Sequence, residues 1–347
     1  MSNKKKLVSI FIPNYNNGKY LNECISSAIN QSYENIEIIV SDDCSTDNSV
    51  AIINSLFKGK VKLNINKRNL GLVGNNKMAR ELSSGCYIYL LDADDIMHTD
   101  AISRLVCEIE DKNVDIIGSQ VQCFGSESSV SKFPIEDKDI KACLYLGNAV
   151  TYSGSLYKRK ILDDVEKYNV PAHDYLFWIH AASKGYKFRN VDDVFLWYRK
   201  HATNETKLNS HELDICEGKH RAVALNLLLN KEIDNKELFL HENMTSVFND
   251  INDLDESIIW LEKLFNLVGN GDVQRVRDYY IKFSLRVWRK NSVRGIKVFN
   301  VARKSVFFKE VSVVDKIALF VYCSLKINNK NNIPLPIRKL FYIFKKL

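Results

Sequence analysis

A strict alternation of short apolar runs and amphipathic segments over the first hundred residues constrains the fold more than any other sequence feature. Apolar, β-branched runs predict buried strands, and apolar residues at helical spacing predict helices. Strands and helices in strict turn form a mostly parallel sheet with helices on both faces, so we predict an α/β fold. The predicted strands are 7–12, 36–40, 61–65 and 87–91, and the predicted helices are 20–30, 49–57 and 72–82.

The α/β pattern continues to about residue 212 and then gives way to long amphipathic patterns that predict helices. We therefore expect an α/β domain over residues 1–212 and a helical, basic region over 213–347. The later predicted elements are strands 116–124 and 194–198, and helices 175–182, 258–268 and 273–288.

The net charge of +7 is unevenly distributed. Residues 275–347 hold 18 Lys and Arg against three acidic residues, which leaves a balance of −8 for residues 1–274. Basic and aromatic residues alternate over Arg338–Leu347, and we expect this tail to lie on an anionic membrane. The alternative is a helical subdomain whose lysines are solvated. No nucleic-acid-binding motif accompanies the charge, so we expect no nucleic-acid partner.

Cysteine usage and hydropathy indicate the cellular location of the protein. Its eight cysteines are scattered without a C-x-x-C pair, which favours reduced thiols and a cytoplasmic location. No apolar run approaches the roughly 20 residues needed to cross a bilayer. We therefore expect no membrane span, and at most a peripheral location on the inner face of the cell membrane.

An acidic motif follows the predicted strand 87–91 directly. Asp92, Asp94 and Asp95 place three carboxylates in four positions, and these repel one another unless a cation neutralises them. Mg²⁺ or Mn²⁺ prefers such oxygen ligands together with substrate phosphates, and it stabilises a departing diphosphate. The alternative is a solvated acidic turn that caps the next helix.

Other strand ends carry residues suited to a nucleotide. Tyr15 can lay its ring against a base, and Asp43 can accept a hydrogen bond from a base imide. Asn69 and Gly71 precede a predicted helix whose N-terminus favours phosphate. The alternatives are a loop aromatic, a helix-capping aspartate and an ordinary turn. Ligands of parallel sheets bind at the carboxyl ends of the strands, where Tyr15, Asp43 and the acidic motif fall.

These segments together resemble family 2 glycosyltransferases of the GT-A fold, a Rossmann-like fold that binds nucleotide-diphospho-sugars. The resemblance covers roughly the first 200 residues and rests on four motifs in order. They are Val8–Asn16 with Tyr20-Leu21, Ile38–Asp47, Asn69–Gly71 and Leu91–Asp95. It implies that residues 1–212 form the catalytic domain.

The resemblance assigns roles to individual residues. Pro13, Tyr15 and Asp43 match nucleobase contacts, usually to uridine; Asp92 matches the ribose contact, and Asp94 the metal ligand. The sequence departs from the family pattern at two positions: Asn14 replaces the common Val or Thr, and Cys44 replaces the common Gly.

The resemblance also implies a catalytic base and a late basic segment. Asp174, within His173–Trp178, matches the base, although His173 stands where Glu is commoner. The alternative for Asp174 is a helix cap, and Asp163 and Asp164 are rival candidates. Tyr198–His201 resembles a Y-R-x-H segment, in which Arg199 can neutralise phosphate and His201 can reach the metal or the diphosphate. A strand-end histidine in solvent is the alternative.

The implied activity is inverting, hexosyltransferase-like transfer of a sugar from a nucleotide sugar, usually a UDP-sugar. The acceptor would be a glycan or a lipid-linked saccharide in the synthesis of a cell-surface polysaccharide such as capsule or O-antigen. Two alternatives remain. A sugar nucleotidyltransferase shares the sheet and the acids but normally has a Gly-rich loop near its start, which is missing here. The other is a non-catalytic nucleotide-sugar-binding protein.

Overall fold

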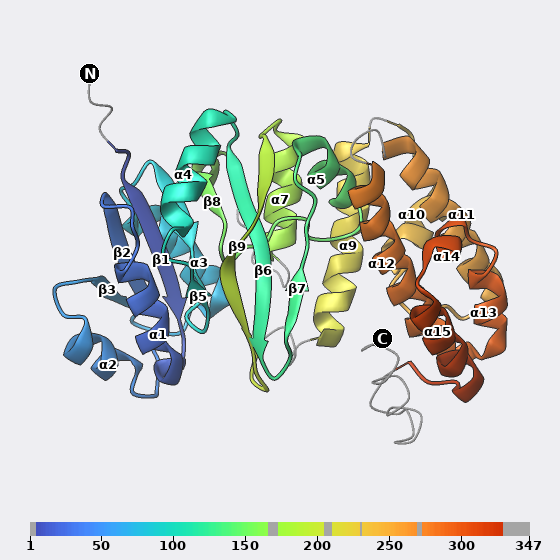
Figure 1. Ribbon diagram of the computed structural model, residues 1–347, viewed down its shortest axis with the longest axis horizontal. Coiled ribbons are helices and arrows are strands. Elements are labelled where there is room, and N and C mark those ends of the chain that lie inside the picture. The colour runs from blue at the N-terminus through green and yellow to red at the C-terminus, as the bar shows by residue number, and fades with distance from the viewer. Residues whose placement is uncertain (1–4, 166–172, 205–209, 230, 269–272, 329–347) are drawn as a thin grey trace. The chain divides into compact units, whose positions relative to one another are not determined.

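The computed structural model describes residues 5–165, 173–204, 210–229, 231–268 and 273–328 (Figure 1). They divide into two compact units. The first contains the residues up to Ile140 and Asn148–Ser210; the second contains Lys141–Gly147 and the residues from His211 onward. The tail predicted to contact a membrane, 338–347, lies outside the described residues.

The first unit is built on a nine-stranded sheet in the order β3-β2-β1-β4-β8-β6-β9-β5, with β7 paired to β6. Strands β1 to β4 are parallel to one another, and β6 and β9 run in the same direction because β8 is antiparallel to both β4 and β6. The predicted α/β fold with a mostly parallel sheet is thus confirmed. The strands are β1 (Val8–Asn14), β2 (Ile36–Asp42), β3 (Lys62–Ile65), β4 (Tyr87–Leu90), β5 (Ile96–Met97), β6 (Ile116–Gly125), β7 (Ser129–Ser131), β8 (Leu156–Lys158) and β9 (Phe188–Lys200).

Helices cover both faces of this sheet (Figure 1). On one face, Ile10 and Ile12 of β1 join a core with Leu21 and Ile25 of α1 and with Leu105 of α4. Burying one such side chain contributes about 2 kcal/mol, so this amphipathic packing fixes the register of the strands. On the other face, the Trp178 and Phe177 rings of α7 pack on Tyr157 of β8. The helices of the first unit, with α5 extending to Cys143, are α1 (Gly18–Ile29), α2 (Ser49–Leu56), α3 (Gly71–Leu82), α4 (Ala101–Asp111), α5 (Asp137–Cys143), α6 (Ile161–Asp164) and α7 (His173–Ser183).

This topology brings several strand ends to one edge. Asn14 at the end of β1 pairs with Asp42 at the end of β2, and β4 ends beside them on the other side of β1. Strand β9 runs in the same direction and ends at Lys200. The acidic motif after β4 and the basic segment that ends β9 therefore lie at the same edge of the sheet.

The second unit is helical in its described part, and none of the described helices is long and apolar enough to cross a membrane. Caps set several helix starts: Ser312, for example, accepts a hydrogen bond from the backbone N–H of Asp315 at the start of α15. The helices are α9 (Ser210–Leu228), α10 (Asn235–Asn243), α11 (Ile251–Val268), α12 (Val273–Asn291), a 3-10 turn (Ser292–Arg294), α13 (Ile296–Ala302), α14 (Val306–Glu310) and α15 (Val313–Leu325).

A buried histidine ties the segment Lys141–Gly147 into this unit. His241 Nε2 lies 2.9 Å from the Tyr145 carbonyl oxygen, and Trp260 Nε1 lies 3.2 Å from His241 Nδ1. Since Trp260 can only donate, Nδ1 accepts and the neutral ring donates through Nε2. Burial, reinforced by the nearby Arg221 charge, lowers the pKa of His241 from 6.5 to about 3.

This pKa predicts a pH-dependent stability. In the unfolded chain the His241 ring binds a proton below pH 6.5, whereas in the folded protein it stays neutral down to about pH 3. The free energy of unfolding therefore falls as the pH is lowered from 6.5 to 3. The expected contribution is about 1.4 kcal/mol per pH unit. Urea unfolding of wild type and His241→Gln between pH 6.5 and 4.5 measures it. Parallel pH profiles for the two proteins would contradict the prediction.

Candidate active site

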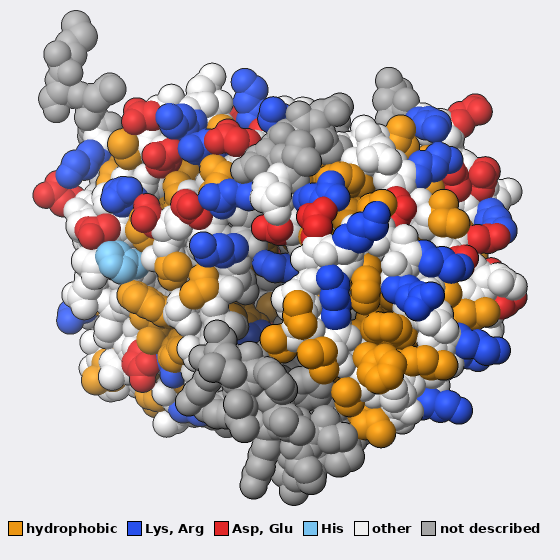
Figure 2. Space-filling view, turned by 45° about the vertical axis from the view of Figure 1, so that its right-hand side comes forward, with side chains coloured by type: hydrophobic (Ala, Val, Ile, Leu, Met, Phe, Trp, Pro, Cys, Tyr) orange, Lys and Arg blue, Asp and Glu red, His pale blue; other side chains and the backbone are white. Residues whose placement is uncertain are grey.

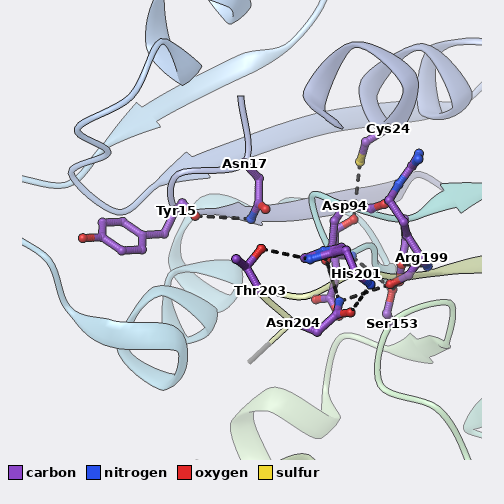
Figure 3. A network of polar contacts seen from close by, with 11 residues as sticks. Tyr15, Asn17, Cys24, Asp94, Ser153, Arg199, His201, Thr203 and Asn204 are labelled. Carbon is purple, nitrogen blue, oxygen red and sulfur yellow. Dashed lines mark hydrogen bonds and ion pairs between the residues drawn. The ribbon is translucent and has the colours of Figure 1, made fainter. Parts of the chain in front are cut away.

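The carboxylate of Asp94 and the ring of His201 meet at the carboxyl edge of the sheet (Figure 3). His201 Nε2 lies 2.8 Å from Asp94 Oδ2, and Asn204 Nδ2 lies 3.2 Å from the same oxygen. Asn204 also accepts a hydrogen bond from the backbone N–H of His201 at 2.6 Å, and its side chain is 7% exposed. Asn204 therefore holds Asp94 and His201 in position, a role that no sequence pattern indicated.

Asp95 is the last residue of the acidic motif, and its side chain points into the protein interior. It is fully buried and accepts hydrogen bonds from Ser153 Oγ at 2.9 Å and from the backbone N–H of Arg199 at 2.9 Å. Burial, and then the charges of Asp94 and Asp92, raise the pKa of Asp95 well above its usual range. Because Ser153 also accepts from the backbone N–H of Asp92, Asp95 joins the motif to β9 and to the loop before β8.

The Arg199 guanidinium is held by protein groups. Its Nε donates to the Asp94 carbonyl at 2.8 Å, and its Nη2 pairs with Glu23 at 2.6 Å. The rings of Tyr20 and Phe124 lie 4.8 and 4.5 Å from the guanidinium carbon. These contacts hold the acidic loop in place, and the predicted contact of Arg199 with phosphate stays a prediction.

The donor set suits a hard divalent cation. A carboxylate oxygen and an imidazole nitrogen converge at Asp94 and His201, with Thr203 Oγ1 3.0 Å from the other ring nitrogen to orient the ring. Among the residues that the structure describes, no group of three or more His, Cys, Asp or Glu could hold a metal by itself. Mg²⁺ and Mn²⁺ are commonly bound by one or two carboxylates plus substrate phosphates, and the Asp94 carboxylate fits that pattern.

The predicted nucleobase residues occupy the neighbouring strand ends. Asp43 is 2% exposed and accepts from Asn66 Nδ2 at 2.9 Å and from the backbone N–H of Leu70 at 2.9 Å. It thereby holds the loop in which Asn69 Oδ1 accepts from the Gly71 N–H at 2.8 Å. Gly71 has φ +74°, a conformation that favours glycine.

Tyr15 and Pro13 lie at the end of β1. Pro13 is buried, whereas the Tyr15 side chain is 46% exposed and its ring points away from the Asp94–His201 pair (Figure 3). An exposed ring at this edge is free to stack on a flat ligand.

The structure explains the departure at Asn14 and shows why glycine is common at the position of Cys44. The buried Asn14 amide donates to Asp42 Oδ2 at 2.7 Å, a hydrogen bond that Val could not form. Cys44 has φ +63°, where a side chain costs about 1 kcal/mol and glycine costs little.

Asp174 lies in the first turn of α7, where the Asn148 amide donates to its Oδ2 at 2.7 Å. Asp174 and Asp92 both contribute, after burial, to raising the pKa of Tyr152, so both charges act on the same buried hydroxyl. The preceding His173 lies 3.3 Å, Nε2 to Nδ2, from Asn76. Of the rival acids, Asp163 is exposed and Asp164 accepts a hydrogen bond from the Tyr186 hydroxyl.

The comparisons with known proteins agree with this fold. The family model described as glycosyl transferase family 2 matches residues 9–166. An Escherichia coli protein, UDP-Glc:alpha-D-GlcNAc-diphosphoundecaprenol beta-1,3-glucosyltransferase WfaP, is 31% identical over 209 residues, or 57% of this chain and 78% of its own. Among solved structures, Staphylococcus aureus TarS residues 1–349 with UDP-GlcNAc has a TM-score of 0.56 at 16% identity, over 87% of this chain and 91% of its own. Mannosyltransferase PcManGT from Pyrobaculum calidifontis with GDP-Man and Mn²⁺ has a TM-score of 0.51 at 15% identity, and covers 88% of each chain.

The fold and the site thus define a glycosyltransferase of the GT-A fold. The chain belongs to glycosyl transferase family 2, as its motifs indicated.

Proposed function

We propose that this enzyme transfers a sugar from a UDP-sugar, with inversion, to a saccharide carried on a lipid diphosphate. The observation that carries the proposal is the Asp94–His201 pair, 2.8 Å apart, at the edge where Asp43 and Tyr15 also lie. Family membership adds the reaction class. The names of the relatives supply the donor and the acceptor: WfaP is named for a UDP-sugar and a diphosphoundecaprenol-linked acceptor, and TarS was solved with UDP-GlcNAc.

Asp94 and His201 would hold Mn²⁺ or Mg²⁺, and the complex of PcManGT with Mn²⁺ supports this choice of metal. When bound, the cation neutralises charge that develops on the departing diphosphate. Asp92 would contact the ribose, with Tyr15, Pro13 and Asp43 around the base and Asn69 and Gly71 near the phosphates. Arg199 would act chiefly by holding the acidic loop, because its guanidinium is engaged by Glu23 and Asp94.

The transfer itself needs one base. Asp174 would take the proton of the acceptor hydroxyl as its oxygen attacks the anomeric carbon. The bond from that carbon to the diphosphate breaks on the opposite side, which inverts the configuration and releases UDP. The hydrogen bond from Asn148 would aim one carboxylate oxygen and leave the other for the acceptor.

A panel of nucleotide sugars tests the proposal. The protein is incubated with each donor and Mn²⁺ or Mg²⁺, and released nucleoside diphosphate is measured. We expect slow hydrolysis of one UDP-sugar without acceptor, and faster release with a lipid-diphosphate-linked saccharide. Pyrophosphate release from an NTP and a sugar phosphate would instead identify a nucleotidyltransferase. Donor binding without turnover under any condition would favour a non-catalytic binding protein.

Asn148 provides a finer prediction. Replacing it with Ala removes the group that orients Asp174, so kcat for transfer should fall about tenfold while KM for the donor stays near wild type. The exposed Asn300→Ala serves as a control. A change confined to donor KM would show that Asn148 does not act through the base.

We further propose that residues 1–212 form the catalytic domain and that the product is a cell-surface polysaccharide such as capsule or O-antigen. The enzyme would work in the cytoplasm at the inner face of the membrane, where the lipid-linked acceptor suggested by the name of WfaP would be located. The basic tail 338–347 would add membrane contact.

A further inference from the structure

Helix α15 carries an uncharged face that points to solvent. Val313, Ile317, Phe320 and Ser324 follow one another at helical spacing on this face, and all four are exposed. The first three are 70%, 44% and 47% exposed. The buried side chains of the helix lie on its opposite side: Ala318, Leu319, Tyr322 and Cys323. A solvent-facing stripe normally carries charge, so this uncharged face is a candidate interaction surface.

An aromatic row anchors the stripe in the core of the unit. The Phe320 ring lies 5.2 Å from Phe299 of α13, Phe299 lies 5.6 Å from Phe308, and Phe308 lies 5.8 Å from the buried Trp288. Ile296, about one helical turn before Phe299, is 43% exposed. The apolar surface is therefore held by packed rings and does not depend on a loose segment.

Positive charge lies beside this surface. Residues 273–328 contain 13 Lys and Arg against three acidic residues, a net charge of +10. Lys316 and Lys309 lie beside the stripe, with Lys316 Nζ 5.3 Å from the Phe308 ring centre and 2.9 Å from the Lys309 carbonyl. Figure 2 shows hydrophobic side chains gathered among Lys and Arg toward the lower right of the view.

A basic groove of about 430 Å³ runs between α12 and α15. Arg286 and Lys290 pair there with Asp214 of α9, and Arg289 lies 5.3 Å from the Tyr322 ring centre. This groove adjoins the side of α15 that carries Tyr322, opposite to the stripe, and the pairs with Asp214 neutralise part of its positive charge. The lining residues are Lys282, Leu285, Arg286, Arg289, Lys290, Asp315 and Asn328.

We propose that the outward face of α15, with Ile296 and the neighbouring Lys309 and Lys316, docks on an anionic lipid bilayer. Val313, Ile317 and Phe320 would enter the headgroup zone, and the basic residues would lie against lipid phosphates. This surface is separate from the tail 338–347, and the proposal does not depend on which sugar is transferred.

Charge argues against two other partners for this face, which are a second copy of the chain and the segment 329–347. A second copy would bring the segment 273–328, of net charge +10, near its own counterpart, and like charges disfavour such a pair. The segment 329–347 contains five Lys and Arg and no acidic residue, so it is repelled by the same surface. An anionic bilayer complements both the charge and the apolar stripe.

Vesicle co-sedimentation of the full-length protein tests the proposal. Vesicles of phosphatidylcholine alone are compared with vesicles containing roughly 30% phosphatidylglycerol, at about 0.1 M salt. We expect binding to the anionic vesicles only. The double variant Ile317→Glu/Phe320→Glu should reduce the partition coefficient at least about tenfold. Ile259→Glu on α11, where the isoleucine is 61% exposed, is the matched control and should bind as wild type.

Two further measurements make each outcome decisive. Circular dichroism and release of nucleoside diphosphate from a soluble donor verify that the variants remain folded and active without vesicles. Wild-type partitioning by the double variant would overturn the proposal and leave the tail as the membrane contact. No binding of wild type to either vesicle would also overturn it, as would a dimer in sedimentation velocity that only the double variant abolishes. A protein that docks but hydrolyses no donor would refute the proposed function and leave the docking surface standing.

Discussion

Asp94→Asn is expected to lower metal-dependent release of nucleoside diphosphate by about a hundredfold to a thousandfold. The asparagine amide keeps the shape of the Asp94 side chain, and the hydrogen bond to Asn204 can rearrange. The substitution removes the negative charge that faces His201. Without that charge the cation and the diphosphate lose their common anchor. Initial rates with saturating donor, measured over a Mn²⁺ titration, give the effect.

Two variants control for this result. Asp163→Asn removes an exposed acid in the same unit and should leave the rate unchanged. Asn204→Ala leaves both proposed ligands in place and removes their support, so it should weaken the apparent Mn²⁺ affinity by about tenfold to a hundredfold. An Asp94→Asn enzyme as fast as wild type, with unchanged Mn²⁺ dependence, would refute the role of Asp94.

Asp174→Asn is expected to reduce sugar transfer by about a hundredfold to ten-thousandfold while donor affinity stays near wild type. The substitution preserves an oxygen that can accept from Asn148, so the first turn of α7 should keep its geometry. What is lost is the group that takes the proton from the acceptor. Transfer is followed with a labelled donor, and donor affinity by calorimetry on the same preparation.

Variants of the rival acid Asp164 test whether the base lies on α6 or on α7. If Asp164→Asn abolished transfer while Asp174→Asn did not, the base would lie on α6. Because Asp164 is bound by the Tyr186 hydroxyl, Tyr186→Phe serves as its control. Wild-type transfer by Asp174→Asn would by itself refute our assignment of the base.

The sequence predicted most of the long elements of the first unit because each carries several buried side chains. Strand β1, with all seven residues buried, is the clearest case. Helix α4 was not among the predicted helices, although five of its positions are buried. The short strands β5, β7 and β8 have two or three residues each, too few to display a period of two.

The candidate site was only partly predictable from the sequence. Asp92, Asp94 and Asp43 follow buried strands, where a parallel sheet gathers ligand contacts, so their position alone made them candidates. Asn204 and Asn148 occupy loops without pattern, and their roles arise only where distant segments meet. Arg199 was expected to face phosphate, and no sequence pattern indicated that Glu23, Tyr20 and Phe124 would surround it.

Calorimetric titration of the purified protein with UDP-, GDP- and dTDP-linked sugars, in Mn²⁺ and then in EDTA, tests the cation-bridged diphosphate site most directly. We predict that at least one UDP-sugar binds in Mn²⁺, that EDTA weakens this binding at least about tenfold, and that Asp94→Asn removes the difference. A folded protein that binds every donor equally with and without the cation, or binds none, would contradict the site at Asp94 and His201.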